Sequence, residues 1–296
     1  MSADTLLFVI TGGLVLGALY ALMATGLAVV WTTLGIFNFA HGAFIAAGAY
    51  IAWQISSAEA SGLGYAAGAL GSVVGMFFVG VACYALLVKP FERQPNLVLL
   101  SVITTLAGAS VLESGIDILW GSRSKQLPRI VDGDVSLAGV TISANEAVLM
   151  VFVLVILTVL GLFLRRAPAG RAMRAVAQNR ESAQLMGLDV PRLYAIAFGL
   201  SAALAAFAGV FVGSIRFMTP TMGSDPLMKA LIVVIFGGVA RFTSPIFAAF
   251  IVGLIEAFAT FYAGLYWAPA VLFAIMIVVL IIKPEGLFGK YQRTVQ

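Results

Sequence analysis

The stretch Ala147-Val-Leu-Met-Val-Phe-Val-Leu-Val-Ile-Leu-Thr-Val-Leu-Gly-Leu-Phe-Leu164 decides the fold class of this chain. It runs for 18 residues without a charged side chain and ends at Arg165 and Arg166. An apolar run of ~18 residues or more is long enough for an α-helix to cross the hydrocarbon core of a bilayer. The run shows no strict alternation of apolar and polar residues, which argues against a strand of a membrane barrel. It therefore predicts a transmembrane helix.

The composition extends this interpretation to the whole chain. Hydrophobic residues make up 61% of the 296 residues and charged residues only 10%, whereas a soluble domain carries about 25% charged residues. So few charges cannot cover the surface of a soluble fold, and the high hydrophobicity excludes disorder. Cys83 is the only cysteine, so a disulfide scaffold is also excluded and Cys83 is interpreted as a small packing residue. The remaining class is an all-α polytopic membrane protein.

Nine segments are apolar enough to be spans, and we expect about 8–10 transmembrane helices in a single membrane domain, residues 1–296. The seventh segment is short enough to be half a span or re-entrant. If it is re-entrant, another segment must split to keep the number of crossings odd, and the long, glycine-rich first segment is the place where we expect that split. The segments are 5–33, 36–54, 64–88, 97–119, 146–164, 193–215, 227–240, 244–263 and 267–282.

The distribution of Lys and Arg predicts the orientation. Alternating segments place twelve of these cations in the loops on one side and five in the loops on the other. Loops rich in Lys and Arg stay in the cytoplasm, so the N-terminus is expected outside and the C-terminus inside. The net charge of +4 is accordingly interpreted as a loop signal, and no nucleic-acid partner is expected.

Two long loops follow from this topology: an outer loop at about 120–145 and a cytoplasmic loop at about 165–192. From Arg171 the cytoplasmic loop is rich in strong helix formers, and Gly187 is placed to end a helix. We expect one polar helix or a pair of short helices beneath the membrane. Met173, Val176 and Ala177 would form one apolar stripe, and Ala183, Met186 and Gly187 another. Such a segment is either a surface helix held by anionic lipid or a docking helix for a cytoplasmic partner.

Several motifs resemble one transporter family. Glu181-Ser-Ala183 followed by Gly187 is similar to the Glu-Ala-Ala…Gly loop of ABC-importer permeases. Asn38-Phe-Ala-His-Gly42 with Gly48-Ala-Tyr50 resembles the signature of branched-chain amino-acid permeases, and Gly17-Ala-Leu-Tyr-Ala-Leu22 is also similar. The resemblance continues through Arg174-Ala-Val-Ala-Gln-Asn-Arg-Glu-Ser-Ala183 to the ending Lys283-Pro-Glu-Gly-Leu-Phe-Gly289. The motifs occur in order over nearly the whole chain, which most resembles the shorter, H-type subunit.

The resemblance implies a transport subunit of the bacterial inner membrane and not an enzyme. It implies a second, M-type-like permease subunit, two cytoplasmic ATPase subunits that bind ATP and Mg, and a soluble binding protein that delivers the solute. It also implies that residues of the cytoplasmic loop couple to the ATPase, namely Arg174, Arg180, Glu181, Ala183 and Gly187. In agreement, the chain contains no Gly-x-x-x-x-Gly-Lys-Ser/Thr phosphate loop, so no cofactor is expected in it.

One stretch departs from the family pattern. Arg241 and Phe242 stand in Gly237-Gly-Val-Ala-Arg-Phe-Thr-Ser-Pro245, where the family often has Gly-Gly-x-Gly-Ser. The bulky replacement argues against close backbone packing there and against simple transfer of the usual solute. Branched-chain amino acids are the family's usual cargo, and other amino acids, amides or urea remain alternatives.

Three polar residues in or near spans are candidates for the solute pathway or its gate. His41 is the only histidine and follows Asn38 by three residues, and the pair either ties two helices together or lines the pathway. A metal site is not expected, because no second histidine exists. Glu256 lies mid-span, where an ionisable group normally faces protein or water. We expect Glu256 either to pair with Lys229 or Arg216 or to contact solute. Intramembrane acids such as Glu256, Glu113 and Asp117 could also serve a self-sufficient secondary carrier, which is the competing hypothesis from a different class.

Overall fold

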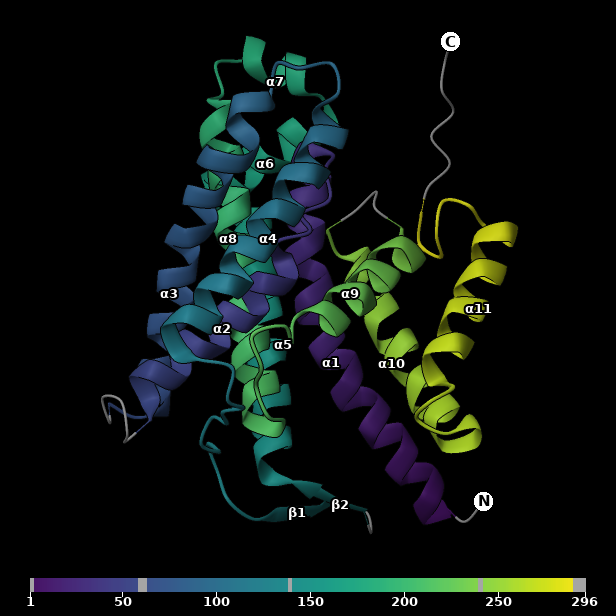
Figure 1. Ribbon diagram of the computed structural model, residues 1–296. Helices are drawn as coiled ribbons and strands as arrows, with labels where there is room; N and C mark the ends of the chain where they lie inside the picture. The colour runs from purple at the N-terminus through teal and green to yellow at the C-terminus, as the bar shows by residue number, and fades with distance from the viewer. Residues whose placement is uncertain (1–2, 58–62, 138–139, 239–241, 290–296) are drawn as a thin grey trace.

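The computed structural model describes residues 3–57, 63–137, 140–238 and 242–289 (Figure 1). A two-stranded antiparallel hairpin pairs β1 (Asp134–Leu137) with β2 (Val140–Ser143). The rest of the regular structure is helical: α1 (Ala3–Leu34), α2 (His41–Ser56), α3 (Tyr65–Cys83), the π-helical turn η1 (Tyr84–Val88), the 3₁₀ turn η2 (Lys89–Phe91), α4 (Leu97–Trp120), α5 (Ala144–Arg166), α6 (Pro168–Gln178), α7 (Arg180–Leu185), α8 (Val190–Ile215), α9 (Ser224–Gly237), α10 (Ser244–Ala263) and α11 (Ala268–Ile282).

The predicted class of a helical, multi-pass membrane protein is confirmed. Within the described residues, six helices are long and apolar enough to cross a membrane: α1, α3 with its η extension, α4, α5, α8 and α10. All nine predicted segments contain a helix, but α2, α9 and α11 have only 16, 14 and 15 residues. The number of crossings therefore stays a prediction.

Helices α1 and α8 form the centre of the bundle, and glycines allow their neighbours to approach closely. Helix α10 lies on α1 where Gly253 faces Gly13 and Gly17, and a β-carbon on Gly253 would come 2.5 Å from the Gly17 nitrogen. Small residues spaced four apart permit such close contact between membrane helices. Helix α1 is continuous over 32 residues. The expected split of the first segment is wrong, because these glycines serve helix packing and do not break the helix.

Two of the short helices begin at the same point inside the molecule. Gly42, in the first turn of α2, and Gly223, which precedes α9, are in backbone contact, and a β-carbon on Gly42 would lie 2.7 Å from the Gly223 carbonyl oxygen. The second segment thus begins its helix at His41 and not at residue 36, and the seventh begins at Ser224 and not at 227. Both starts are buried meeting points between helices.

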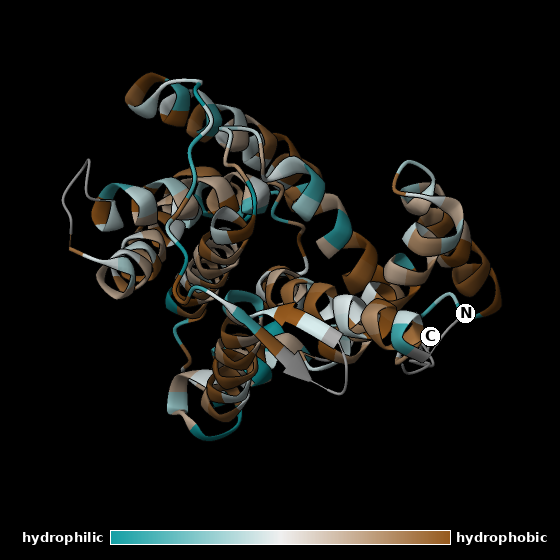
Figure 2. Cartoon of the chain, turned by 90° about the horizontal axis from the view of Figure 1, so that it is seen from below, coloured by the Kyte–Doolittle hydropathy of each residue, from teal (hydrophilic) through white to brown (hydrophobic). Residues whose placement is uncertain are grey.

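The two long loops lie at opposite ends of the bundle (Figure 1). The hairpin and the start of α1 are at one end, and α6 and α7 are at the other. The hairpin pairs Val135 with Ile142 and Asp134 with Ser143. Figure 2, a view along the bundle, shows hydrophobic colour along the helices and hydrophilic colour mainly in the connections. Leu86, Val111 and Ile281 are among the outward-facing apolar side chains, as expected for a surface in contact with lipid or with another membrane subunit.

The C-terminal motif packs against the end of α9. The backbone nitrogens of Leu287 and Phe288 donate hydrogen bonds to the carbonyl oxygens of Phe236 and Gly237, at 2.7 and 3.2 Å. Gly238 has φ +82° and lies against the Glu285 carbonyl. Gly237 and Gly238 thus pack closely against the C-terminal motif, ahead of the bulky replacement, and the expectation about backbone packing at the replacement itself stays a prediction. Arg241 itself lies outside the described residues.

Candidate functional site

A cleft of about 690 Å³ opens among α1, α5, α8, α9 and α10. Its outer part includes Phe8 and Ile142, near the start of α1 and in the hairpin, and its inner part includes Met23. The cleft thus reaches from the hairpin end of the bundle to the middle of α1. Most of its lining is apolar, and this is the composition expected of a site that holds a small solute by shape and a few polar groups.

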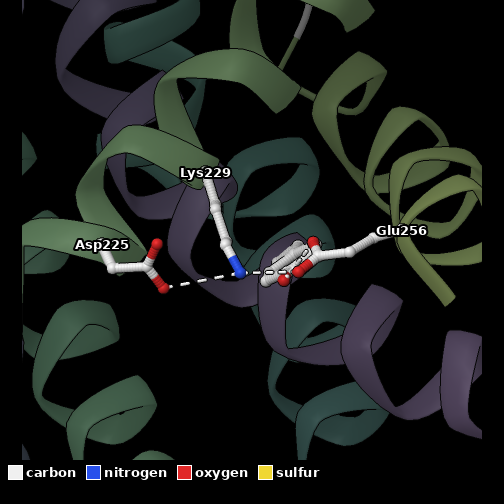
Figure 3. A network of polar contacts seen from close by, with 4 residues as sticks. Asp225, Lys229 and Glu256 are labelled. Carbon is white, nitrogen blue, oxygen red and sulfur yellow. Dashed lines mark hydrogen bonds and ion pairs between the residues drawn. The ribbon is translucent and has the colours of Figure 1, made fainter. Parts of the chain in front are cut away.

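Charged groups from two helices and a tyrosine hydroxyl from a third meet in this cleft. The ammonium of Lys229 on α9 lies 2.6 Å from Glu256 Oε1 on α10 and 3.5 Å from Asp225 Oδ2, one turn before it. The hydroxyl of Tyr20 on α1 donates to Glu256 Oε2 at 2.5 Å. Figure 3 shows Lys229 between the two carboxylates. Glu256 and Lys229 have side chains only 8% and 16% exposed, so this pair is shielded, while Asp225, 67% exposed, offers a carboxylate to the open cleft.

Glu256 pairs with Lys229, one of the two cations named as partners from the sequence. Arg216, the other one, lines the same cleft at the end of α8. Glu113 and Asp117 lie on α4, away from the residues that line the cleft.

His41 and Asn38 lie behind the cleft and do not line it. The His41 ring is fully buried, with Nδ1 3.2 Å from Ser201 Oγ on α8 and Nε2 3.1 Å from the Met23 carbonyl oxygen on α1. Gly26 leaves the space that the ring occupies. Asn38 precedes the helix, so the two do not share a helical face as expected, and its Oδ1 instead accepts from the Ala40 nitrogen. The arrangement ties α1, α2 and α8 together at the floor of the cleft.

The loop at about 165–192 contains a pair of short helices, α6 and α7, which is one of the two arrangements that its sequence predicts. In α6, Met173 and Val176 are buried while Ala177 is exposed. Gly170 lies within α6, and its backbone packs on Phe163 near the end of α5. The Arg174 guanidinium turns back toward α5, where Nη2 donates to the Arg165 carbonyl oxygen at 3.2 Å.

Helix α7 is short and is capped at both ends. Asn179 Oδ1 accepts from the Ser182 nitrogen at 2.8 Å. Beyond the helix, Gly187 has φ +81°, its nitrogen donates to the Gln184 carbonyl, and the Leu188 nitrogen donates to the Ala183 carbonyl. This pair of bonds is a Schellman motif, which requires a left-handed residue at the position of Gly187. The predicted helix stop at Gly187 is confirmed.

The faces of α7 differ from the predicted apolar stripe. Ala183 is buried at 4%, but Met186 and Leu185 are exposed at 83% and 89%, and Gly187 is exposed too. The stripe of Ala183, Met186 and Gly187 is wrong, because the helix ends before Met186 and the spacing rule no longer applies. Glu181 is exposed beside these apolar side chains, so the tip of α7 combines an acid with two uncovered hydrophobic residues.

Arg180, the first residue of α7, faces into the protein. Its Nη2 lies 3.7 Å from Glu92 Oε2, and its guanidinium carbon is 5.4 Å from the centre of the Tyr194 ring on α8. Tyr84, in the π-helical turn, donates its hydroxyl proton to Glu92 Oε1. Of the loop residues that the family resemblance singles out, Arg174 and Arg180 thus make contacts within the chain, while Glu181 points to solvent.

With these two regions described, comparison with known proteins identifies the family. A family model described as the permease component of branched-chain amino acid transport systems matches residues 9–280. The chain belongs to the branched-chain amino acid permease family. The high-affinity branched-chain amino acid transport permease LivH of Escherichia coli (strain K12) is 29% identical over 290 residues, 94% of each chain.

Two further relatives extend the comparison. The corresponding branched-chain amino acid permease BraD of Pseudomonas aeruginosa is 27% identical over 293 residues, 95% of each chain. The autoinducer 2 import system permease LsrC of Klebsiella pneumoniae is 33% identical over 141 residues, 47% of this chain and 40% of that one. No solved structure matches the chain. The chain is accordingly a membrane permease of the ABC transporter type, similar over its length to H-type subunits.

Four residues of the two clusters were not singled out from the sequence. Tyr20 and Asp225 join the charged pair in the cleft, and Glu92 and Tyr84 join Arg180. Tyr20 lies on α1, and Tyr84 and Glu92 lie before α4, so only the packing of distant helices brings them to Glu256 and Arg180. A usable signal existed for Asp225, which precedes Lys229 by four residues at the spacing of a helical ion pair.

Proposed function

We propose that this permease is the membrane subunit of an ATP-driven importer for branched-chain or related amino acids, which a soluble binding protein delivers. One observation carries the proposal. This family member has a cleft that contains charged side chains and opens toward one end of the bundle, and it has the helix pair α6–α7 at the other end. A solute that enters from one side and an ATPase that acts from the other require these two features. ATP and Mg would bind to the two partner ATPase subunits, and a second, M-type-like permease would complete the membrane domain.

The cleft is the proposed place where solute passes this subunit. Its apolar walls suit the side chain of a branched amino acid, and Asp225 and Arg216 offer charges of both signs at its polar end. Glu256 is a pathway residue in this proposal because it holds the Lys229 side chain in place in the lining of the cleft. Asn38 and His41 act indirectly: they fix the meeting of α1, α2 and α8 behind the cleft.

The tip of α7 is the proposed contact with the ATPase. Glu181 would pair with a cation of the ATPase, while Leu185 and Met186 would enter an apolar groove. Gly187 and Ala183 shape the helix end, and the Arg174 side chain fastens α6 to α5. The loop at about 165–192 is thus the coupling loop, and the loop at about 120–145 faces the opposite compartment.

The orientation follows from the same assignment. The loops that the alternation of spans groups with the loop at about 165–192 hold twelve Lys and Arg residues against five in the others, and loops rich in these residues remain in the cytoplasm. We therefore place the hairpin and the N-terminus outside, the C-terminus inside, and the protein in the bacterial inner membrane.

The experiment that tests this function is purification of the tagged permease from native membranes in mild detergent. We expect ATPase subunits and a second permease to accompany it, and reconstituted vesicles to take up radiolabelled leucine only with ATP and the binding protein. Uptake that proceeds with a purified permease alone and follows an ion gradient would contradict the proposal and support a self-sufficient carrier.

A solute other than an amino acid is the alternative. One relative that matches part of the chain, LsrC, is named as a permease for autoinducer 2. Competition of leucine uptake by urea, acetamide and other amino acids separates these alternatives. If leucine binds and moves poorly while an amide moves well, the amino-acid assignment is wrong but the permease role stands.

A further inference from the structure

A cluster at the α7 end of the bundle joins three segments that are distant in the sequence. Glu92 lies just after η2, its side chain is only 9% exposed, and it receives both Arg180 from α7 and the Tyr84 hydroxyl from η1. The Tyr84 ring stands edge-on to the Tyr194 ring of α8, with centroids 6.4 Å apart, and Arg180 lies over Tyr194. Each polar group of the cluster therefore contacts another element of the fold.

We infer that Arg180 and Glu92 form a latch that transmits movement of α7 to the end of α3, and that Arg180 is a positioning residue and not an ATPase contact. This inference rests on the proposed role of α7. It assigns to Glu92 and Tyr84 a part in coupling that no sequence motif indicates.

The geometry supports transmission because α7 has few other attachments to α3. Along the chain, α7 continues only into α6 and α8, through Asn179 and the Gly187 stop. The Arg180–Glu92 pair adds a lateral link to the turn between α3 and α4. A largely shielded carboxylate that loses its cation is left uncompensated, so the link resists separation.

The segment that receives this link is irregular in a way that suits movement. Tyr84–Val88 is π-helical, a conformation that is rare and frequent at functional sites. The Thr104 hydroxyl of α4 donates to the Leu87 carbonyl oxygen at 2.7 Å, so the π turn is also tied to α4. Displacement of Glu92 by α7 would thus reach both α3 and α4 through one turn.

A charge-swap cycle in the reconstituted importer tests the latch. Arg180→Glu and Glu92→Arg should each lower the number of leucine molecules transported per ATP hydrolysed by roughly tenfold, within the range for residues of one ion-pair network. Both variants should retain the ATPase subunits on purification. The double variant Arg180→Glu/Glu92→Arg should recover most of the ratio, and Arg180→Lys should lose less than Arg180→Glu.

Arg123→Glu is the matched control, because it makes the same charge change on an exposed residue outside the loop at about 165–192 and should keep the wild-type ratio. The inference is overturned if Arg180→Glu detaches the ATPase while Glu92→Arg does not, since Arg180 would then be a direct contact. It is also overturned if the double variant is no better than the worse single variant. Failure of the wild-type permease to carry any ATPase would instead refute the proposed function, so the two failures are distinguishable.

Discussion

Glu256 illustrates how a carboxylate can be stable inside a membrane protein. It accepts from Tyr20 through one oxygen and from Lys229 through the other, at 2.5 and 2.6 Å. Taking both charges out of water is costly, and the attraction between them offsets that cost only when the geometry is good and the remaining lone pairs are satisfied. Here the phenol supplies the additional donor. The intact pair therefore adds little to the stability of the fold, but the loss of one partner alone should be strongly destabilising.

Truncating either partner should be worse than removing both. We expect Glu256→Leu or Lys229→Met to lower the stability of the purified permease by about 3 kcal/mol, because each leaves a shielded charge unpaired. Glu256→Gln should be milder, since the amide oxygen can still accept from Lys229 while the amide nitrogen donates to the Tyr20 oxygen. The double variant Lys229→Met/Glu256→Leu should regain most of the lost stability, as measured by thermal unfolding in detergent.

Leucine uptake adds the functional part of this comparison. If Glu256 also shapes the pathway, the double variant should fold well yet transport poorly. A Glu256→Leu protein with wild-type melting temperature and uptake would show that the side chain contributes to neither.

The sequence alone identified Glu256 and two candidate partners because ionisable residues are rare in apolar runs. It did not identify Tyr20, 236 residues away. The rotation of α1 against α10 decides that contact, and Gly13, Gly17 and Gly253 set this rotation through close packing.

At the scale of elements, the helix pair α6–α7 was predictable and its surface was not. Helix formers, Pro168 and Gly187 mark the two helices in the sequence. Which side chains of α7 are exposed depends on where its last turn ends. Because the helix ends at Leu185, Met186 lies beyond it, at the exposed tip, and does not continue an apolar stripe with Ala183. The short helices α2 and α9 were misplaced for a related reason: their first turns are set by a glycine contact and not by a capping residue.

The glycine at the end of α7 gives a direct test of the coupling helix. In Gly187→Val a β-branched residue must adopt φ +81°, which costs about 1–2 kcal/mol. The Schellman bonds should be lost, and the ATPase subunits should dissociate or respond no longer to the loaded binding protein, while membrane insertion stays normal.

Gly121→Val is the control for this experiment. Gly121 also ends a helix at positive φ, +75°, with open space around it, but it follows α4, at the other end of the bundle. At ψ 168° Gly121 has a conformation that is essentially restricted to glycine, so valine is at least as strained there as at Gly187. Because Gly121 lies away from α7, co-purification of the ATPase should be unaffected. Equal retention of the ATPase in both variants would mean that α7 is only a lipid-bound surface helix.

The contact between the starts of α2 and α9 can be tested by adding one methyl group. Gly223→Ala would push a β-carbon into the Gly42 backbone, and overpacking of this kind costs roughly 1–3 kcal/mol. We expect a lower melting temperature in detergent. Gly75→Ala, in α3 with no atom within 4 Å of the new carbon, should leave it unchanged or slightly higher.

On the scale of the whole molecule, α8 connects the two candidate regions. It begins at Val190, shortly after α7 ends, and its last turns, with Phe211 and Ile215, line the cleft. A helix of 26 residues spans about 39 Å at 1.5 Å per residue, which is the thickness of a bilayer with part of its headgroups. Movement of α7 can thus reach the cleft along one rigid element. The alternation of spans predicted that the two loops lie at opposite ends, but the place of the cleft between five helices was not readable from the sequence.

The remaining prediction concerns the orientation of the protein in the membrane, on which the direction of transport depends. In a Cys83→Ser background, a single cysteine is placed at Asp132, beside the hairpin, or at Gln178, at the end of α6; both positions are exposed. An impermeant thiol reagent added to cells with a permeabilised outer membrane should label Asp132→Cys and not Gln178→Cys. Both should react after the inner membrane is opened, which controls for accessibility. Labelling of Gln178→Cys alone while the inner membrane is still closed would place α7 outside, away from any ATPase, and both the coupling role of α7 and the twelve-to-five charge argument would be wrong.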